Sequence, residues 1–163
     1  MKKALHRKSV VQQIQNRIYC GQPMSFHRVN IRTSVSSLMD EEITIQSLKW
    51  LFGTDVEVVQ DRTTSYHGAI LHVLSAELKR KKDISFFFSK IKPIFDEEFL
   101  QGLDQRIDDA HVVHFRLDAD ALIEKNIVLH NTKEHHVIKC EAKLEVYPQQ
   151  TPIDIFHEYI QEI

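Results

Sequence analysis

The stretch HVIKCEAKLEV, residues 136–146, decides the fold class, because apolar and charged side chains alternate from Ile138 to Val146. One face would carry Ile138, Cys140, Ala142, Leu144 and Val146, and the other Lys139, Glu141, Lys143 and Glu145. This period of two is typical of a strand that buries one face and exposes the other. A slip of one residue would bury four charges, so the pairing register is strongly specified.

The same alternation recurs upstream. Residues 26–35 are predicted to form a strand with apolar side chains on one face and Arg28, Asn30 and Arg32 on the other. Around Tyr66-His67-Gly68, the flanking segments favour a hairpin, although a longer loop also fits. The further strands are expected at residues 56–63, 70–79, 111–117 and, as a short one, 127–129.

Helical spacing predicts the elements between these strands. Ser37, followed three residues later by Asp40, resembles a capping box, so we expect a helix over residues 38–52 that ends at Gly53. A second helix, capped by Asp83, would bury an i, i+3, i+4, i+7 pattern of apolar positions. The remaining helical segments are expected at residues 96–107, at 119–125 as a turn or short helix, and after the N-cap Thr151, with Pro152 at N1.

This order of elements predicts an α+β fold, a two-layer sandwich in which helices pack on one face of a mostly antiparallel sheet. Only four Gly and four Pro interrupt the chain, so helices and strands must fill most of it. Three successive phenylalanines, Phe86–Phe88, are interpreted as core. The 163 residues suffice for one domain, which we expect at residues 24–163, preceded by a basic helical extension at 1–23.

Charge is distributed unevenly along the chain. The first acidic residue is Asp40, so residues 1–39 hold seven Lys and Arg and no anion. The other 14 Lys and Arg face all 23 Asp and Glu, which gives the rest a formal charge of −9 within an overall −2. Such asymmetry indicates an end that faces a polyanion, most commonly nucleic acid. The narrow apolar stripe of the extension would let it dock on the body, join a partner chain, or order only when bound.

Composition also excludes some classes of protein. No apolar run approaches the length of a membrane span, and no signal-peptide pattern follows the basic N-terminus, so we expect a cytoplasmic protein with no membrane partner. Two cysteines, Cys20 and Cys140, are too few for a disulfide framework and are expected to be free thiols.

Two groups of cations are candidate phosphate contacts. Lys79-Arg80-Lys81-Lys82 lead into the helix at Asp83, whose free N–H groups favour an anion; a solvated strand-to-helix junction is the alternative. Arg28, Arg32 and Arg116 point outward on their predicted strands and would share a surface if those strands are neighbours. The same face would include His114, Lys139 and Lys143, together with Glu141 and Glu145, which would pair with the cations.

Ten histidines raise the question of a metal site. On a strand, residues one or three apart point to opposite faces, so neither His111 with His114 nor His135 with His136 chelates by itself. His130 would join them only through the fold. No Cys-rich or helical His spacing is found, so we expect no metal and no cofactor.

Catalysis has less support than binding. Asp118 and Asp120 would hold Mg²⁺ or act as acid and base only if a deep pocket gathered them with histidines. A turn or helix cap explains Asp118 more simply. The sequence has no nucleophile elbow, P-loop, dinucleotide fingerprint or zincin signature, so we expect no catalytic residues.

Five short motifs occur in a familiar order: Arg28-Val-Asn-Ile-Arg-Thr33, Asp40-Glu41-Glu42, Leu51-Phe52-Gly53, Tyr66-His67-Gly68 and Arg116-Leu117-Asp118. Together they resemble the archaeal RNA-binding proteins predicted to be exosome subunits, over roughly residues 24–163. The resemblance implies the two-layer fold of a large-subunit ribosomal protein that binds ribosomal RNA, without established catalytic activity. The segment before Met24 lies outside the family pattern, and the turn at residues 65–70 lacks its longer glycine and proline pattern.

These observations predict a non-catalytic RNA-binding protein that contacts the backbone of structured RNA and that could serve as an accessory subunit of an RNA-processing assembly. The expected phosphate contacts are Arg28, Arg32, Arg62, Lys79, Arg80, Lys81, Lys82 and Arg116. Tyr66 and His67 would add a stacking or 2′-hydroxyl contact. The alternative is a protein-interaction subunit or homodimer, which an exposed apolar patch would favour.

Overall fold

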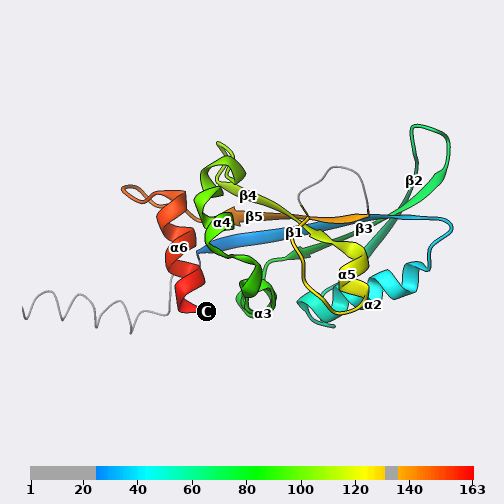
Figure 1. Ribbon diagram of the computed structural model, residues 1–163, viewed down its shortest axis with the longest axis horizontal. Coiled ribbons are helices and arrows are strands. Elements are labelled where there is room, and N and C mark those ends of the chain that lie inside the picture. Colours follow the sequence, from blue (N-terminus) through cyan, green and yellow to red (C-terminus); the bar gives the residue numbers. More distant parts are fainter. Residues whose placement is uncertain (1–24, 131–135) are drawn as a thin grey trace, which may run out of the picture.

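The alternating stretch that ends the predicted sheet forms a strand, β5, second from one edge of a five-stranded antiparallel sheet (Figure 1). The computed structural model describes residues 25–130 and 136–163, so the predicted extension at 1–23 lies outside the described residues. The elements are β1 (Phe26–Ser36), α2 (Glu41–Phe52), β2 (Val59–Thr64), β3 (Ile70–Leu78), α3 (Lys81–Ile91), η1 (Lys92–Ile94), α4 (Glu97–Gln101), η2 (Leu103–Arg106), β4 (Val112–Asp118), α5 (Ala119–Ile123), β5 (Val137–Leu144) and α6 (Pro152–Glu162).

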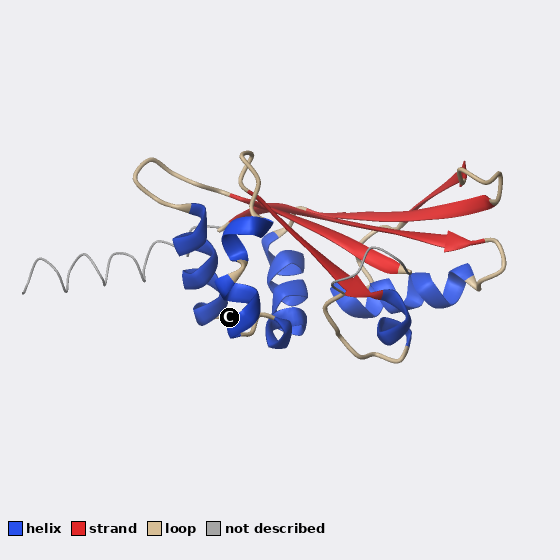
Figure 2. Ribbon diagram, turned by 45° about the horizontal axis from the view of Figure 1, so that its top comes forward, coloured by secondary structure: helices blue, strands red, loops and turns tan. Residues whose placement is uncertain are grey.

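The strand order is β2-β3-β1-β5-β4, and every neighbouring pair is antiparallel. The central strand β1 places Ile31 opposite Ala76 on one side and Cys140 on the other. These three side chains are buried on the same face, as the alternating pattern requires. Figure 2 shows that all the helices of the described residues lie on that face of the sheet and none of them on the other. The α+β class and the two-layer arrangement are therefore confirmed.

The core lies between the sheet and the helices and is rich in phenylalanine. Phe88 stacks on Phe26 with ring centroids 4.3 Å apart, and both rings meet Tyr159 edge to face. Phe87 is fully buried as well, whereas Phe86 is 44% exposed, so the interpretation of all three as core is wrong for Phe86. Helical geometry turns that position away from the sheet.

Two helix starts differ from the prediction. Asp40, and not Ser37, is the N-cap of α2, because its side chain accepts hydrogen bonds from the N–H groups of Glu42 (3.0 Å) and Ile43 (3.4 Å). α3 begins two residues before Asp83, and Arg80 is its N-cap. Asp83 does not cap the helix; its carboxylate binds the Arg80 guanidinium instead.

Three downstream predictions have mixed outcomes. The helix expected over residues 96–107 is interrupted at Gly102, which separates α4 from η2. The short strand expected at residues 127–129 is a single bridge between Leu117 and Leu129. The predicted caps are confirmed at Thr151, which accepts from the Asp154 N–H in α6, and at Asp118, which accepts from the Ala121 N–H in α5.

Among the described residues, no helix is both long and apolar enough to cross a membrane. Cys140 is a free, buried thiol, as expected. Cys20 lies outside the described residues.

Candidate nucleic-acid interface

Three cations line up across the face of the sheet that the helices leave open. Pairing registers place Arg32 opposite Lys139, and Lys139 opposite Arg116, so the three side chains project from adjacent strands β1, β5 and β4. We call Arg32, Lys139 and Arg116 the basic row. Neighbouring strands lie about 4.8 Å apart, so the row spans about 10 Å across the strands. The same row continues to Ser75 on β3 and Val59 on β2, neither of which is charged.

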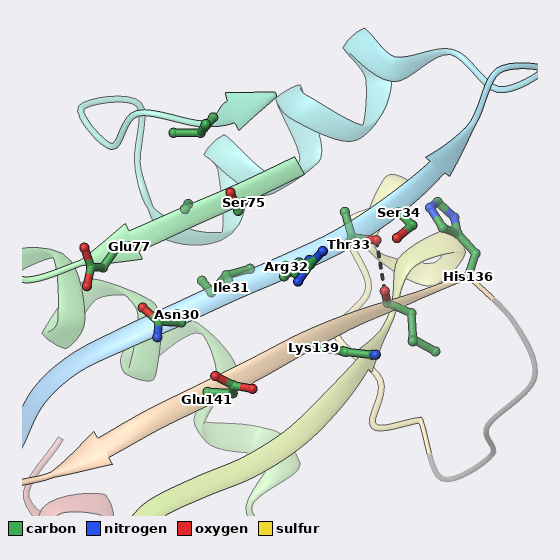
Figure 3. Close-up of a pocket in the computed structure, with 13 residues that line it drawn as sticks. Asn30, Ile31, Arg32, Thr33, Ser34, Ser75, Glu77, His136, Lys139 and Glu141 are labelled. Carbon is green, nitrogen blue, oxygen red and sulfur yellow. Dashed lines mark hydrogen bonds between the residues drawn. The ribbon is translucent and has the colours of Figure 1, made fainter. Parts of the chain in front are cut away.

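The basic row borders two hollows in the open face. Arg32 and Lys139 line a hollow of about 850 Å³ over β3, β1 and β5, together with polar side chains that include Asn30 and Ser75 (Figure 3). Lys139 and Arg116 line a second hollow of about 460 Å³ towards the β4 edge. Because Lys139 borders both hollows, the row connects them. Within the described part of the chain, none of the three cations has an ion pair or hydrogen bond through its side chain.

A row of opposite charge lies two residues farther along the strands. There, Asn30 on β1 is flanked by Glu77 on β3 and Glu141 on β5, and His114 on β4 completes the row. We call Glu77 and Glu141 the acidic row. Glu77 accepts a hydrogen bond from Lys79 at 2.7 Å, and this contact lowers the pKa of the Glu77 carboxyl. The acidic row therefore bounds the basic row along the strands.

Cations beyond the acidic row are held by partners. The Arg28 guanidinium lies 4.0 Å from the Glu77 carboxylate, and Lys143 donates a hydrogen bond to the carbonyl of Ala110. These contacts are exposed and weak, since ion pairs between exposed groups contribute about 0–1 kcal/mol. The structure thus brings Arg28, Arg32 and Arg116 onto one face, as predicted, but leaves only the last two without partners among the described residues.

The cations around the start of α3 are also paired. The Arg80 guanidinium contacts both oxygens of the Asp83 carboxylate, at 2.6 and 3.2 Å, and this carboxylate raises the pKa of Arg80. Lys79 binds Glu77, and the Lys82 ammonium lies 3.3 Å from the Asp55 carboxylate. A phosphate at this helix start would compete with three carboxylates for the same side chains. These cations are thus less available to a phosphate than the cations of the basic row are.

Four histidines of the described residues form pairs with carboxylates. His114 lies 2.8 Å from Asp108 and 3.9 Å from Glu141, and its hydrogen bond is the main cause of the lowered pKa of the Asp108 carboxyl. The other contacts pair His72 with Glu41, His130 with Asp118 and His136 with Asp120, at 2.9, 3.5 and 3.3 Å. Residues 25–130 and 136–163 contain no group of three or more side chains arranged to hold a metal ion. His135 lies outside those residues.

The other predicted contacts lie away from the basic row. Arg62 pairs with His72 in the β2–β3 ladder, and this register places its side chain on the helix-covered side. Tyr66 and His67 occupy the turn between β2 and β3, where the Tyr66 side chain is 99% exposed. Asp118 and Asp120 belong to separate histidine pairs, so they do not form one acid–base site.

The central place of Lys139 depends on which strands pair. The alternation within residues 136–146 predicts that Lys139 points outward, but it does not predict that β5 lies between β1 and β4. That position gives Lys139 a cation on each side. The sequence therefore predicted the outward orientation of Lys139, but it did not predict the position of Lys139 between two other cations.

The part of the chain that forms this face is similar in sequence to known proteins. A family model described as RNA binding matches residues 28–144, which include β2 to β5 and all but the first two residues of β1. The chain is 23% identical over 133 residues to the RNA-binding protein PAB1135 of Pyrococcus abyssi (strain GE5 / Orsay), a match that covers 76% of this chain and 85% of that protein.

Solved structures share the fold at similar identity. Mth689, a DUF54 protein from Methanothermobacter thermautotrophicus, superposes with a TM-score of 0.69 at 23% identity and covers 84% of this chain and 96% of its own. Protein AF2318 from Archaeglobus fulgidus, also of DUF54, gives a TM-score of 0.67 at 24% identity, with coverages of 84% and 98%. These similarities confirm the two-layer fold.

Proposed function

The chain belongs to the RNA binding family, and from this premise we propose that its open sheet face binds the phosphate backbone of RNA. The observation that carries the proposal is the basic row: Arg32, Lys139 and Arg116 lie side by side without partners among the described residues. A paired cation must give up its protein carboxylate before it binds a phosphate, whereas an unpaired cation loses no such contact. An unpaired cation therefore gains the full free energy of counterion release when it binds RNA. Arginine adds bidentate hydrogen bonds to phosphate oxygens.

The chemistry of the face favours backbone contacts over base stacking. The outward side chains of β1 to β5 include no Phe, Tyr or Trp within the described strands, while sheets that bind single strands stack bases on such rings. A duplex presents its phosphates and keeps its base faces covered. We therefore infer that paired, structured RNA is the ligand, and that binding does not lead to catalysis.

Paired cations have a secondary role in this proposal. Arg28 and the group Lys79–Lys82 contribute peripheral contacts, because breaking an exposed ion pair costs little. These side chains lie beside the acidic row or beyond it. RNA that is bound to the basic row therefore contacts them only with the edges of the RNA. Arg62 contributes to the field around the hairpin.

Salt titration of RNA binding tests the proposal. We compare the wild-type chain with the double variant Arg32→Gln/Arg116→Gln, using a fluorescent RNA duplex. Each lost phosphate contact reduces the slope of log K against log salt by about 0.9, so the double variant is expected to lower it by nearly 2. The matched control, Lys79→Gln/Lys82→Gln, removes the same charge from paired side chains and is expected to change the slope by less than half as much. Equal effects of the two variants would contradict a dominant basic row.

A second candidate function rests on an exposed apolar group at the start of α2. Leu38 is 96% exposed, Ile43 45% and Met39 37%. Exposed apolar side chains that lie together favour a protein partner. We propose that this end of the molecule docks on an RNA-processing assembly, in keeping with an accessory role in the cytoplasm. The variant Leu38→Ser/Ile43→Ser is expected to be lost from the assembly that the wild-type chain enters in its native cells. If the variant stays in that assembly, this second proposal is contradicted.

A further inference from the structure

The β2–β3 hairpin presents two adjacent aromatic side chains, Tyr66 and His67, that belong neither to the core nor to an ion pair within the described part of the chain. Tyr66 is 99% exposed, whereas the next most exposed described aromatic side chain, Tyr147, is 51% exposed. The His67 ring packs edge to face against the Tyr66 ring, with centroids 5.3 Å apart. Burial of a large aromatic side chain is favourable, so complete exposure leaves its stacking capacity available to a ligand.

The turn that carries Tyr66 is held by its own hydrogen bonds. The Gly68 N–H donates to the Ser65 carbonyl at 2.9 Å, and the Ser65 N–H donates to the Ala69 carbonyl at 2.7 Å. The Ser65 hydroxyl also accepts from the Ala69 N–H at 3.1 Å. Gly68 has φ +83°, which glycine adopts without strain. The aromatic pair is therefore presented on an ordered turn, which reduces the entropy lost on binding.

The hairpin lies on the open side of the sheet and some distance from the basic row. In both ribbon views its tip lies on the side away from α2 and α3 (Figures 1 and 2). The basic row crosses β3 at Ser75, five residues from the end of that strand at Ile70. At about 3.4 Å per residue, this places the turn at least about 17 Å from the row.

The path from the basic row to the turn carries little negative charge. On β3, the residues between Ser75 and the turn include no Asp or Glu, so a phosphate backbone that runs this way meets no carboxylate on that strand. The register places Arg62 and His72 on the helix-covered side, and it places Asp61 of β2, opposite Val73, on the open face beside the path.

We propose that Tyr66 stacks on an unpaired base of an RNA whose paired stem lies on the basic row. This inference rests on the proposed function and specifies its ligand class. An aromatic ring stacks only on a base whose face is uncovered, so the base at Tyr66 belongs to a loop or bulge. An A-form RNA helix rises by about 2.8 Å per base pair, so 17 Å corresponds to about six base pairs. The ligand is a stem of at least that length which ends in a loop or contains a bulge.

Binding of two matched RNAs tests the inference. One is a stem-loop, and the other is the same stem closed as a blunt duplex; each is titrated against the full chain by fluorescence anisotropy. Tyr66→Ala is expected to weaken stem-loop binding by about 5- to 150-fold, the loss for one base–aromatic stack, and to leave blunt-duplex binding unchanged. Tyr66→Phe retains the ring and is expected to bind both RNAs like the wild type. Tyr147→Ala, in the segment between β5 and α6, is the control for loss of an exposed tyrosine.

The outcomes separate this inference from the proposed function. Equal weakening of both RNAs by Tyr66→Ala, or of neither, overturns the stacking contact, while a reduced salt slope in Arg32→Gln/Arg116→Gln still supports the basic row. Absence of binding to either RNA at low salt overturns the proposed function itself. A change in sedimentation of Tyr66→Ala without a change in RNA affinity assigns the turn to a protein contact and also overturns the inference.

Discussion

Phe86, Phe87 and Phe88 are consecutive in the sequence but differ in burial, because successive positions on an α-helix point about 100° apart. Phe87 and Phe88 are fully buried, and Phe86 faces solvent with the Lys90 ammonium 5.3 Å from its ring centroid. Phe88 contacts three further rings besides Phe87, so it connects α3 to β1 and α6. For these three phenylalanines, the position on the helix therefore decides how much each side chain contributes to the stability of the core.

Substitution of Phe88 is expected to be far more costly than substitution of its neighbour. Phe88→Ala removes a buried ring and leaves a cavity, which should lower the free energy of unfolding by about 3–5 kcal/mol. Phe86→Ala removes an exposed ring and should change it by about 0.5 kcal/mol or less. Urea unfolding followed by circular dichroism measures both values. Similar losses in the two variants would contradict the orientation of α3.

The Cys140 thiol is expected to report global unfolding. Burial raises the pKa of this thiol well above its ordinary value, so the thiol stays protonated across neutral and mildly alkaline pH and is shielded from reagents. In a Cys20→Ser background, alkylation of the native chain should stay slow between about pH 7 and 9 and become fast in urea. Mass spectrometry of the alkylated chain measures the rate. Fast labelling without denaturant would show that β5 opens locally.

At the same scale, the sequence predicted side-chain orientation but not side-chain partners. The alternation in residues 26–35 and 136–146 was sufficient to place Arg32 and Lys139 outward. Asp83 was expected to cap a helix, yet its carboxylate binds the Arg80 guanidinium three residues earlier. A helix cap and an ion pair both give the carboxylate hydrogen-bond donors. Only the local path of the backbone decides which of the two forms. Which cations remain unpaired therefore had to come from the structure.

Elements were predicted where one physical signal dominates. The period of two along β1 and β5, and the Thr151-Pro152 start of α6, each involve only local sequence, and the structure confirms them. The segment at residues 96–107 keeps helical spacing through Gly102, so periodicity alone did not predict the break there. The β2–β3 pairing was predicted from the turn that joins the two strands. The neighbours of the other strands were beyond prediction because their pairing joins residues far apart in the sequence, about a hundred positions between β1 and β5.

The start of α2 offers a direct comparison of two candidate caps. Asp40→Ala removes the carboxylate that accepts from the first-turn N–H groups and is expected to lower the free energy of unfolding by about 1 kcal/mol. Ser37→Ala removes a side chain with no role in the cap and is expected to change it by a few tenths at most. Thermal and urea unfolding of the two variants provide the test. The opposite ranking would place the helix start at the capping box that the sequence suggested.

On the scale of the whole molecule, the two-layer arrangement separates stability from binding. Helices and apolar side chains occupy one face of the sheet, and the charged rows occupy the other (Figure 2). Substitutions in the basic row therefore leave the core unchanged, which makes its role in RNA binding measurable without loss of the fold.

The alternation of charged rows makes the open face complementary to a copy of itself. A two-fold axis parallel to the rows, midway between the basic and acidic rows, would bring Arg32 and Lys139 of one molecule towards Glu77 and Glu141 of the other. Each exposed pair contributes at most about 1 kcal/mol, so association is expected to be weak and lost at high salt. Sedimentation velocity at low and high ionic strength measures it, and Glu77→Gln/Glu141→Gln should abolish it. Association that persists in this variant would point to the apolar group near Leu38.

This self-complementarity makes RNA and a second protein molecule competitors for one surface. Duplex RNA carries only negative charge, so it engages the basic row and is repelled by the acidic row, whereas a protein copy engages both. Added RNA would then dissociate the electrostatic dimer, and the fraction of protein in dimers at low salt would fall as RNA is titrated in. The acidic row thereby links the association state of the protein to the amount of RNA around it.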